Sequence, residues 1–211
     1  MLKQISRFIV ASSFLLAIAP SHAVLYSFEE ITNNSPINVA SQLSVDVTGA
    51  GSTVFFQFFN NVGLASSITD IYFDNTSNLL ALPMVITDSG AGVAFSTPAT
   101  PGSLPGQNDA GFVTTAGFSA DSDAPASSNG VNTSTEWVKL QFGTTVGNTF
   151  DDVIAAMNAG TFRVGLHVQA LSDDESESYV TMIPEPEIYA MMGLGLGLMG
   201  WVARRRKQQA A

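Results

Sequence analysis

Few side chains in this 211-residue chain have the type and spacing that catalysis requires. The chain has no cysteine, which excludes thiol catalysis and thiolate metal sites, and it has only two histidines. His22 falls within a predicted leader, which leaves His167, and a lone strand histidine is far more often a packing residue than a base. No G-x-S-x-G elbow is present to expose a serine nucleophile. Asp88-Ser89-Gly90 resembles half of an aspartic protease site, but such a site needs two carboxylates that share a proton, and the sequence has no second copy. A turn is the better interpretation of this tripeptide. We therefore predict no enzymatic activity and no catalytic residue.

Side chains suited to ligand binding lie on two predicted strands. Trp137 precedes the inward-pointing Val138, so it should face outward, where its ring could stack on a sugar. Arg163, His167 and Gln169 share one face of a later strand and could line a groove with polar contacts. These four residues are the candidate ligand-binding residues. The alternatives are that Trp137 covers a sheet edge and that the three polar side chains are simply solvated.

Acidic clusters supply the hard oxygen ligands that calcium prefers. The candidates are Asp121 and Asp123 in one cluster and Asp173, Asp174 and Glu175 in another. Neither cluster follows the EF-hand loop pattern, and the second lies between two predicted strands as a hairpin tip would. Carboxylates this close together are more often simply solvated than arranged around a bound cation. We predict no cofactor, with calcium as the alternative.

Alternating apolar and polar residues predict strands that would position these side chains. The alternation is clear over 43–48, 69–74 and 161–170, so each of these strands should bury one face. Residues 53–59, by contrast, are apolar on both faces, which predicts a strand that is covered on both sides.

One helix is predicted after residue 148. Thr149 can cap its N-terminus, Asp151 and Asp152 favour the positive end of the helix dipole, and Gly160 can end it. From 87 to 134 the chain is rich in Gly, Ser, Pro and Asp, and short strands near 93–95 and 111–118 should interrupt this stretch. The pattern predicts a mainly β fold, an antiparallel β-sandwich of jelly-roll type over 24–182 with one short helix.

The last 29 residues combine a proline triplet, an apolar segment and a basic run. Pro184-Glu185-Pro186 marks an extended joint, because proline disfavours a helix interior. Residues 188–203 carry no charge and would span roughly 24 Å as a helix, somewhat less than the ~30 Å hydrocarbon core. They predict a marginal transmembrane helix. The basic run should stay in the cytoplasm and place the preceding domain on the far side of the membrane. It consists of Arg204, Arg205, Arg206 and Lys207.

This order of triplet, glycine-rich and leucine-rich span, and Arg-Arg-Arg-Lys resembles the PEP-CTERM sorting signal of Gram-negative bacterial proteins. The resemblance covers 183–211, with Ile183 where the common form has valine and Glu187-Ile188 where it has serine or threonine. It implies recognition at Pro184, Glu185 and Pro186 and removal of the tail by an exosortase, a membrane-embedded cysteine transpeptidase. It also implies an association with exopolysaccharide and biofilm production. The rest of the chain is similar to other PEP-CTERM ectodomains of undetermined function, which implies no ligand.

The first 23 residues are typical of a signal peptide. A basic start with Lys3 and Arg7 precedes a 12-residue apolar core, and Ser21 and Ala23 are small residues at the positions that signal peptidase requires. We predict handling by the Sec translocon and signal peptidase, with cleavage after Ala23. A retained anchor is the alternative, although the apolar core is short for one.

The segment between the two targeting ends is strongly acidic. It holds 16 Asp and Glu residues against Lys139 and Arg163, a formal charge of −14. Such a charge makes nucleic acid and anionic membrane surfaces poor partners. We predict a non-enzymatic exported protein that is held briefly in the inner membrane and then resides at the cell surface or in an extracellular matrix with exopolysaccharide. The alternatives are a carbohydrate-binding module, with or without calcium, and a hydrolase of extracellular polymers that depends on an acid or on His167.

Overall fold

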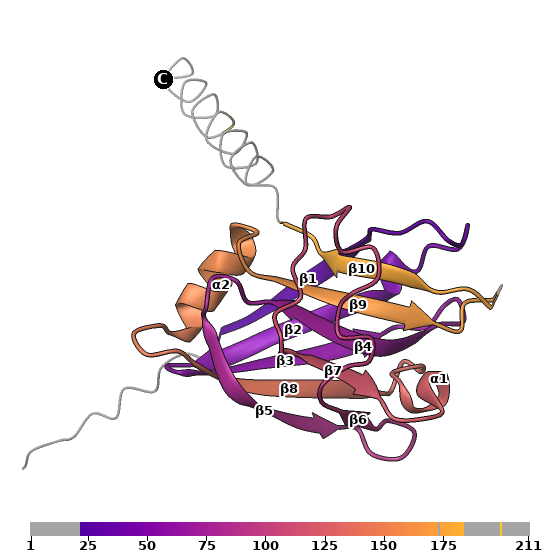
Figure 1. Ribbon diagram of the computed structural model, residues 1–211, viewed down its shortest axis with the longest axis horizontal. Helices are drawn as coiled ribbons and strands as arrows, with labels where there is room; N and C mark the ends of the chain where they lie inside the picture. Colours follow the sequence, from indigo (N-terminus) through magenta and orange to yellow (C-terminus); the bar gives the residue numbers. More distant parts are fainter. Residues whose placement is uncertain (1–21, 173, 184–198, 200–211) are drawn as a thin grey trace, which may run out of the picture.

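The computed structural model describes residues 22–172, 174–183 and 199, and the first two ranges form a mainly β domain (Figure 1). All ten strands of this domain join one antiparallel sheet, in the order β5-β8-β3-β2-β1-β10-β9-β4-β7-β6. The predicted mainly β class is confirmed. The elements are β1 (His22–Glu30), η1 (Ala40–Gln42), β2 (Leu43–Ala50), β3 (Thr53–Asn60), β4 (Ser67–Asp74), β5 (Leu80–Asp88), β6 (Phe95–Ser96), β7 (Ser119–Ser122), α1 (Ala126–Asn129), β8 (Trp137–Thr144), α2 (Phe150–Asn158), β9 (Arg163–Gln169) and β10 (Glu177–Thr181).

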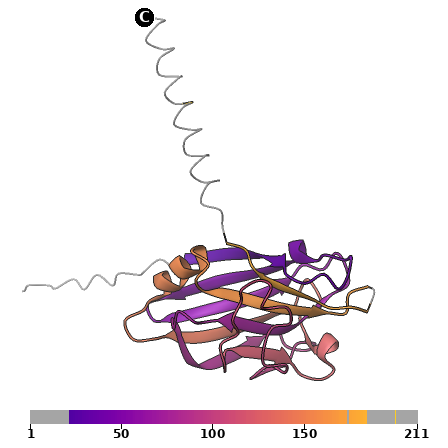
Figure 2. The ribbon, with the colours of Figure 1, turned by 45° about the horizontal axis from the view of Figure 1, so that its top comes forward.

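Strand β1 belongs to both halves of the sheet. Residues 22–27 pair with β2, and residues 28–30 pair with β10. We call β5, β8, β3, β2 and β1 the first half-sheet, and β1, β10, β9, β4, β7 and β6 the second half-sheet. The two halves lie one over the other with α2 at one end, so the sheet is nearly closed (Figure 2). The sequence did not predict that one strand would serve both layers.

Aromatic side chains fill the space between the half-sheets. Phe56 on β3 meets Phe73 on β4 edge to face, with ring centroids 5.1 Å apart, and Phe73 meets Phe142 on β8 at 5.0 Å. Phe162, just before β9, lies 5.9 Å from Phe56. Edge-to-face pairs of this kind stabilise a core beyond the apolar area they bury. They join the two halves without any disulfide.

The burial of β3 and β4 differs from the prediction for each strand. On β3 buried and partly buried residues alternate, so Phe55 and Phe59 lie on a partly exposed face. On β4 all eight residues are buried, although its sequence alternates between apolar and polar. The reason is that a long loop, residues 97–118, covers the outer face of the second half-sheet. Leu104 and Phe112 from this loop pack with Tyr72 of β4.

The long loop packs closely against β9 because residue 165 is glycine. At Gly165 on β9 a Cβ atom would lie 2.6 Å from Leu104 and 3.1 Å from Phe112, so only glycine allows this close approach. The strand predicted near 111–118 was wrong, since this stretch is turn and coil, and β7 begins just after it. The strand predicted near 93–95 is present as the two-residue β6.

Helix α2 confirms the predicted connector. The backbone N–H of Thr149 donates to Asp152 Oδ2 at 2.7 Å, which is half of a capping box. At the other end Gly160 has φ +68°, and the N–H groups of Gly160 and Thr161 bond the carbonyls of Met157 and Ala156. This is a Schellman motif, for which glycine is the preferred residue. Within the described residues, no helix has the length and apolar character needed to cross a membrane.

Candidate functional site

The four predicted ligand-binding residues lie on two opposite outer surfaces. Trp137 begins β8 on the outer face of the first half-sheet. Arg163, His167 and Gln169 share the outer face of β9, as predicted, but β9 belongs to the second half-sheet. Because the two halves pack face to face, their outer faces point away from each other. The structure therefore offers two separate candidate sites.

The face around Trp137 carries partly exposed aromatic rings. Phe59 on β3 is the cross-strand partner of Trp137, and Phe55 is the partner of Gln141. All three aromatic side chains are partly buried. Lys139 Nζ lies 5.3 Å from the centroid of the Trp137 ring, which places the cation in range of a cation–π interaction. We call the outer surface formed by Phe55, Gln57, Phe59, Trp137, Lys139 and Gln141 the aromatic face.

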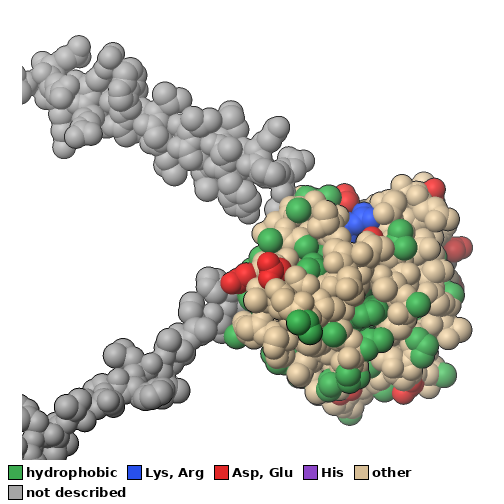
Figure 3. All heavy atoms as spheres, turned by 60° about the vertical axis from the view of Figure 1, so that its left-hand side comes forward, with side chains coloured by type: hydrophobic (Ala, Val, Ile, Leu, Met, Phe, Trp, Pro, Cys, Tyr) green, Lys and Arg blue, Asp and Glu red, His purple; other side chains and the backbone are tan. Residues whose placement is uncertain are grey.

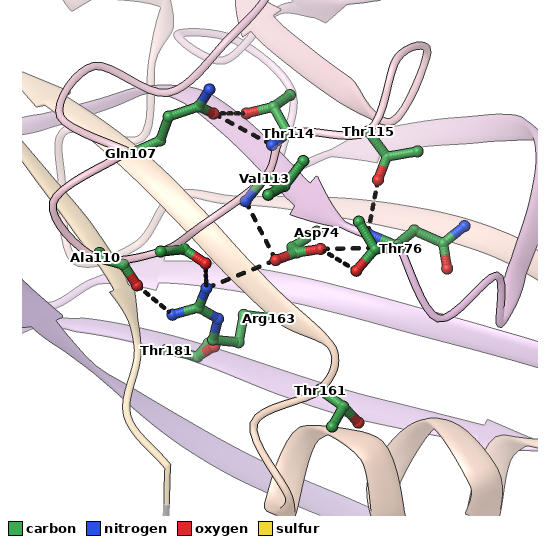
Figure 4. Close-up of polar contacts among 12 residues, drawn as sticks. Asp74, Thr76, Gln107, Ala110, Val113, Thr114, Thr115, Thr161, Arg163 and Thr181 are labelled. Carbon is green, nitrogen blue, oxygen red and sulfur yellow. Dashed lines mark hydrogen bonds and ion pairs between the residues drawn. The ribbon is translucent and has the colours of Figure 1, made fainter.

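Arg163 is fully engaged with the long loop (Figure 4). Its guanidinium donates to the carbonyl of Ala110 at 3.0 Å and to the carbonyl of Gly111, and it lies 3.6 Å from Asp74. The same group sits 5.5 Å from the centroid of the Phe112 ring. These contacts give Arg163 a role in holding the loop on the sheet, and they leave little of it for a ligand.

Asp74 at the end of β4 holds the returning part of the same loop (Figure 4). Its carboxylate accepts from the backbone N–H of Val113 at 3.2 Å and from the hydroxyl of Thr76 at 2.7 Å. Gln107 Oε1 accepts from the hydroxyl of Thr114 at 2.9 Å, which closes the loop on itself. Because of these bonds, the loop is a built part of the domain.

His167 is paired with Asp70, a residue that the sequence did not single out. His167 Nδ1 lies 3.1 Å from Asp70 Oδ2, and their side chains are 12% and 5% exposed. Asp70 also accepts from the hydroxyl of Thr69 at 2.7 Å. The Tyr72 hydroxyl lies 2.9 Å from the carbonyl of Pro101 and 3.3 Å from Asp70 Oδ1, and these two acceptors share its one proton. The histidine therefore belongs to a polar network beneath the loop.

This network includes a row of four polar residues across four neighbouring strands. Ser178 is the register partner of His167, His167 of Asp70, and Asp70 of Asp121. The order of serine, histidine and aspartate is that of a nucleophilic triad. However, Ser178 Oγ is buried, and it has no hydrogen-bond partner among the described residues. The row lacks the serine–histidine bond that would activate the hydroxyl, and its serine is closed to substrate.

Burial and the charge of Asp70 raise the pKa values of two residues near the row. Burial raises the pKa of Asp121, the N–H of Thr100 opposes the rise, and the nearby charge of Asp70 adds to it. Burial and Asp70 also raise the pKa of Tyr72 far above its usual value. The spacing of these residues along the chain gave no signal, since Asp70 and His167 are 97 positions apart.

The predicted calcium ligands that the structure describes lie in two separate segments. Asp121 is held in β7 opposite Asp70, and its Oδ2 accepts from Thr100 N–H at 3.0 Å. Asp123 follows β7, whereas Asp174 and Glu175 lie in the turn before β10, and Asp173 is outside the described residues. Among the described residues, no group of three or more His, Cys, Asp or Glu side chains is placed to hold a metal ion. A calcium site therefore has no support from the described residues.

The chain reaches its sorting segment directly from the last strand. β10 ends at Thr181, the N–H of Met182 donates to the carbonyl of Ser27 on β1 at 3.0 Å, and Ile183 is the last residue described before the tail. A family model for the PEP-CTERM protein-sorting motif matches residues 183–207. Residues 183–207 are a PEP-CTERM sorting motif. This motif implies an exported protein that an exosortase processes.

The triplet at 184–186, the predicted span at 188–203 and the basic run at 204–207 lie outside the described residues, apart from Met199. No curated protein and no solved structure matched the chain. The sorting motif is therefore the feature that links this protein to others.

Proposed function

We propose that this protein is a non-enzymatic surface or matrix protein, delivered through the Sec route, held transiently by its C-terminal span, and released or re-attached by an exosortase. The observation that carries the proposal is the sorting motif at 183–207, which follows the folded domain with no intervening linker.

The positions of the two chain ends support this topology. His22 pairs with Gly49, and a Cβ atom at Gly49 would lie 2.7 Å from Phe150 at the start of α2. Ile183 contacts Gly160 just after α2 ends. Both the leader and the sorting segment therefore join the domain beside α2. Figure 3 looks onto this side of the molecule, where only small groups of acidic side chains lie among hydrophobic and polar ones.

Removal of the exosortase from the native host tests the proposed processing of the sorting motif. We expect the wild-type host to release the protein from the inner membrane, and we expect the host without exosortase to retain the full-length chain there. Immunoblots of inner-membrane, surface and medium fractions measure both outcomes. Equal release from the two hosts would show that another route handles the protein.

A second candidate function, binding of a matrix polysaccharide, is favoured by the aromatic face. Aromatic rings stack on the apolar faces of sugar rings, and the amides of Gln57 and Gln141 can bond hydroxyl groups between them. The registers place Lys139, Gln57 and Asp46 in one row across β8, β3 and β2. An uncharged glycan is not repelled by the formal charge of −14 that this domain carries.

Substitution of Trp137 tests this second function. We expect Trp137→Ala to weaken binding of the mature protein to the host's own purified exopolysaccharide about tenfold, because stacking on one ring contributes about 1.4 kcal/mol. Val113→Ala is the matched control, since Val113 is an exposed apolar residue on the opposite outer surface. Affinity electrophoresis measures both variants. Unchanged migration of Trp137→Ala, or an equal loss in both variants, would exclude the aromatic face as the binding site.

A further inference from the structure

The outer face of the first half-sheet is exposed and nearly free of charge. At the outward positions of β5, β8, β3, β2 and the part of β1 that pairs with β2, every residue is partly or fully exposed. Among these residues, only Asp46 and Lys139 carry a charge, and the two charges cancel. The domain as a whole carries a formal charge of −14. Two copies can therefore approach through this face with less repulsion than their total charges would cause.

The two charges of this face lie on either side of Gln57. The registers pair Asp46 on β2 with Gln57 on β3, and Gln57 with Lys139 on β8. Because neighbouring strands are about 4.8 Å apart, the two charged residues are roughly 10 Å apart with Gln57 midway. Neither of them forms an ion pair with another described residue. The face thus presents one positive and one negative charge, symmetrically placed, to whatever binds it.

We propose that the aromatic face, together with Asp46, binds the same face of a second copy of this chain about a two-fold axis that runs along β3. Such an axis places β2 of each copy over β8 of the other. Asp46 then meets Lys139 of the second copy, and Lys139 meets the second copy's Asp46. Gln57 lies on the axis and meets its own counterpart. Each charge gains an opposite partner, and the two contacts form together.

The charges favour this axis over the other two-fold axis that joins the same faces. An axis that runs across the strands would set Asp46 against Asp46 and Lys139 against Lys139. Like charges placed opposite each other across an interface are strongly unfavourable. The arrangement along β3 is therefore the one that the sequence of this face supports.

Aromatic side chains supply the apolar part of the proposed interface. Phe55 and Phe59 also lie on the outer face of β3, so each would meet its own counterpart along the axis. Aromatic pairs stabilise an interface beyond the apolar area that they bury. Sheets that pack face to face are about 10 Å apart and interlock their side chains. With the half-sheet's five strands giving a width of roughly 19 Å, the interface is small, and we expect a Kd in the micromolar range.

Cross-linking through single cysteines tests the position of the axis. The chain has no cysteine, so an introduced thiol is the only one present. Gln57→Cys places the two thiols opposite each other, whereas Thr87→Cys, in the same row on β5, separates them sideways by roughly 19 Å. We expect a short bismaleimide to cross-link Gln57→Cys at least tenfold faster, although Thr87 is the more exposed residue. Denaturing gels of protein isolated from the native host measure both rates.

Charge reversal tests the reciprocal ion pairs. We expect Asp46→Lys to weaken the dimer at least tenfold, because each new lysine would meet Lys139 of the other copy. The same change lowers the net negative charge of the domain, so it would strengthen association if overall repulsion decided the outcome. Adding Lys139→Glu recreates both ion pairs with their signs exchanged and should bring the Kd to within several-fold of the wild type. Sedimentation velocity over a range of concentrations measures each Kd.

Each result either supports the dimer or overturns it. Faster cross-linking at position 57 and rescue by the double reversal would support it. A wild-type protein that stays monomeric well above the micromolar range would overturn it, as would equal cross-linking at the two positions or a double variant no tighter than Asp46→Lys. A matrix polysaccharide would compete for the same face. A monomeric protein that loses polysaccharide binding on Trp137→Ala would assign the face to that glycan and overturn the dimer.

Discussion

At the scale of single residues, His167 and Arg163 serve the fold through partners that are distant in sequence. His167 is paired with Asp70, and Arg163 bonds two loop carbonyls and lies beside Asp74. Sequence spacing placed both on one strand face, which is correct, but it could not show that a loop covers that face. Trp137 differs, because it lies on the outer face of the first half-sheet and its side chain stays partly exposed.

The Asp70–Asp121 pair predicts a pH-dependent effect at one residue. The folded state raises the pKa of Asp121, so the folded protein binds a proton more readily than the unfolded chain, and stability falls as pH rises through this range. Asp121→Asn removes the charge but retains an oxygen to accept from Thr100. We expect this variant to have a higher Tm than the wild type at pH 7, with the gain shrinking as pH falls toward the ordinary carboxyl range. Calorimetry from pH 3 to pH 8 measures it. A gain that grows on acidification would contradict the assignment.

Substitution of Arg163, with Lys139 as the matched control, tests whether Arg163 holds the long loop on the sheet. We expect Arg163→Met to lower the free energy of unfolding by about 2–3 kcal/mol, because it leaves two loop carbonyls and the Asp74 carboxylate without their charged partner. Lys139→Met should change it by about 0.5 kcal/mol or less, since Lys139 lies on a solvent-facing strand face. Urea denaturation measures both. Similar losses in the two variants would show that Arg163 does not hold the loop.

At the scale of elements, features determined by local chemistry were predictable and those determined by distant contacts were not. The capping residue Thr149 and the terminating Gly160 act within a few residues of α2, so the sequence predicted its bounds closely. For β3 and β4, the period-two pattern showed which residues share a face, but burial of the outer face depends on whether the long loop covers it. The sequence also did not predict that β1 belongs to both half-sheets, because its change of partner from β2 to β10 after Ser27 is not reflected in its composition.

The end of α2 predicts a link between this helix and the exit of the chain. Gly160→Ala forces a side chain into a φ of +68° and places its Cβ 2.4 Å from Ile183, whereas Gly51→Ala meets a similar φ of +58° with no atom within 4 Å. We expect each variant to lose about 1 kcal/mol of stability. Only Gly160→Ala should speed hydrogen exchange at Met182, because only there does the new methyl group displace Ile183. Equal exchange in the two variants would show that Ile183 does not depend on this contact.

At the scale of the whole molecule, the domain is a nearly closed acidic β-structure in which the start of β1 and Ile183 both lie near the short helix α2. The sorting motif begins two residues after β10 ends, so the folded domain directly precedes it in the chain. The aromatic face is on the first half-sheet, away from the outer face that the long loop covers, and its side chains stay partly exposed.

The central claim, export followed by removal of the C-terminal tail, is tested most directly by intact mass spectrometry of the protein isolated from its native host. The account predicts a mature chain that begins near Val24 and ends near Pro184, with the span and the basic run absent. A mass that extends to Ala211 would contradict it and would make this protein an ordinary membrane-anchored one.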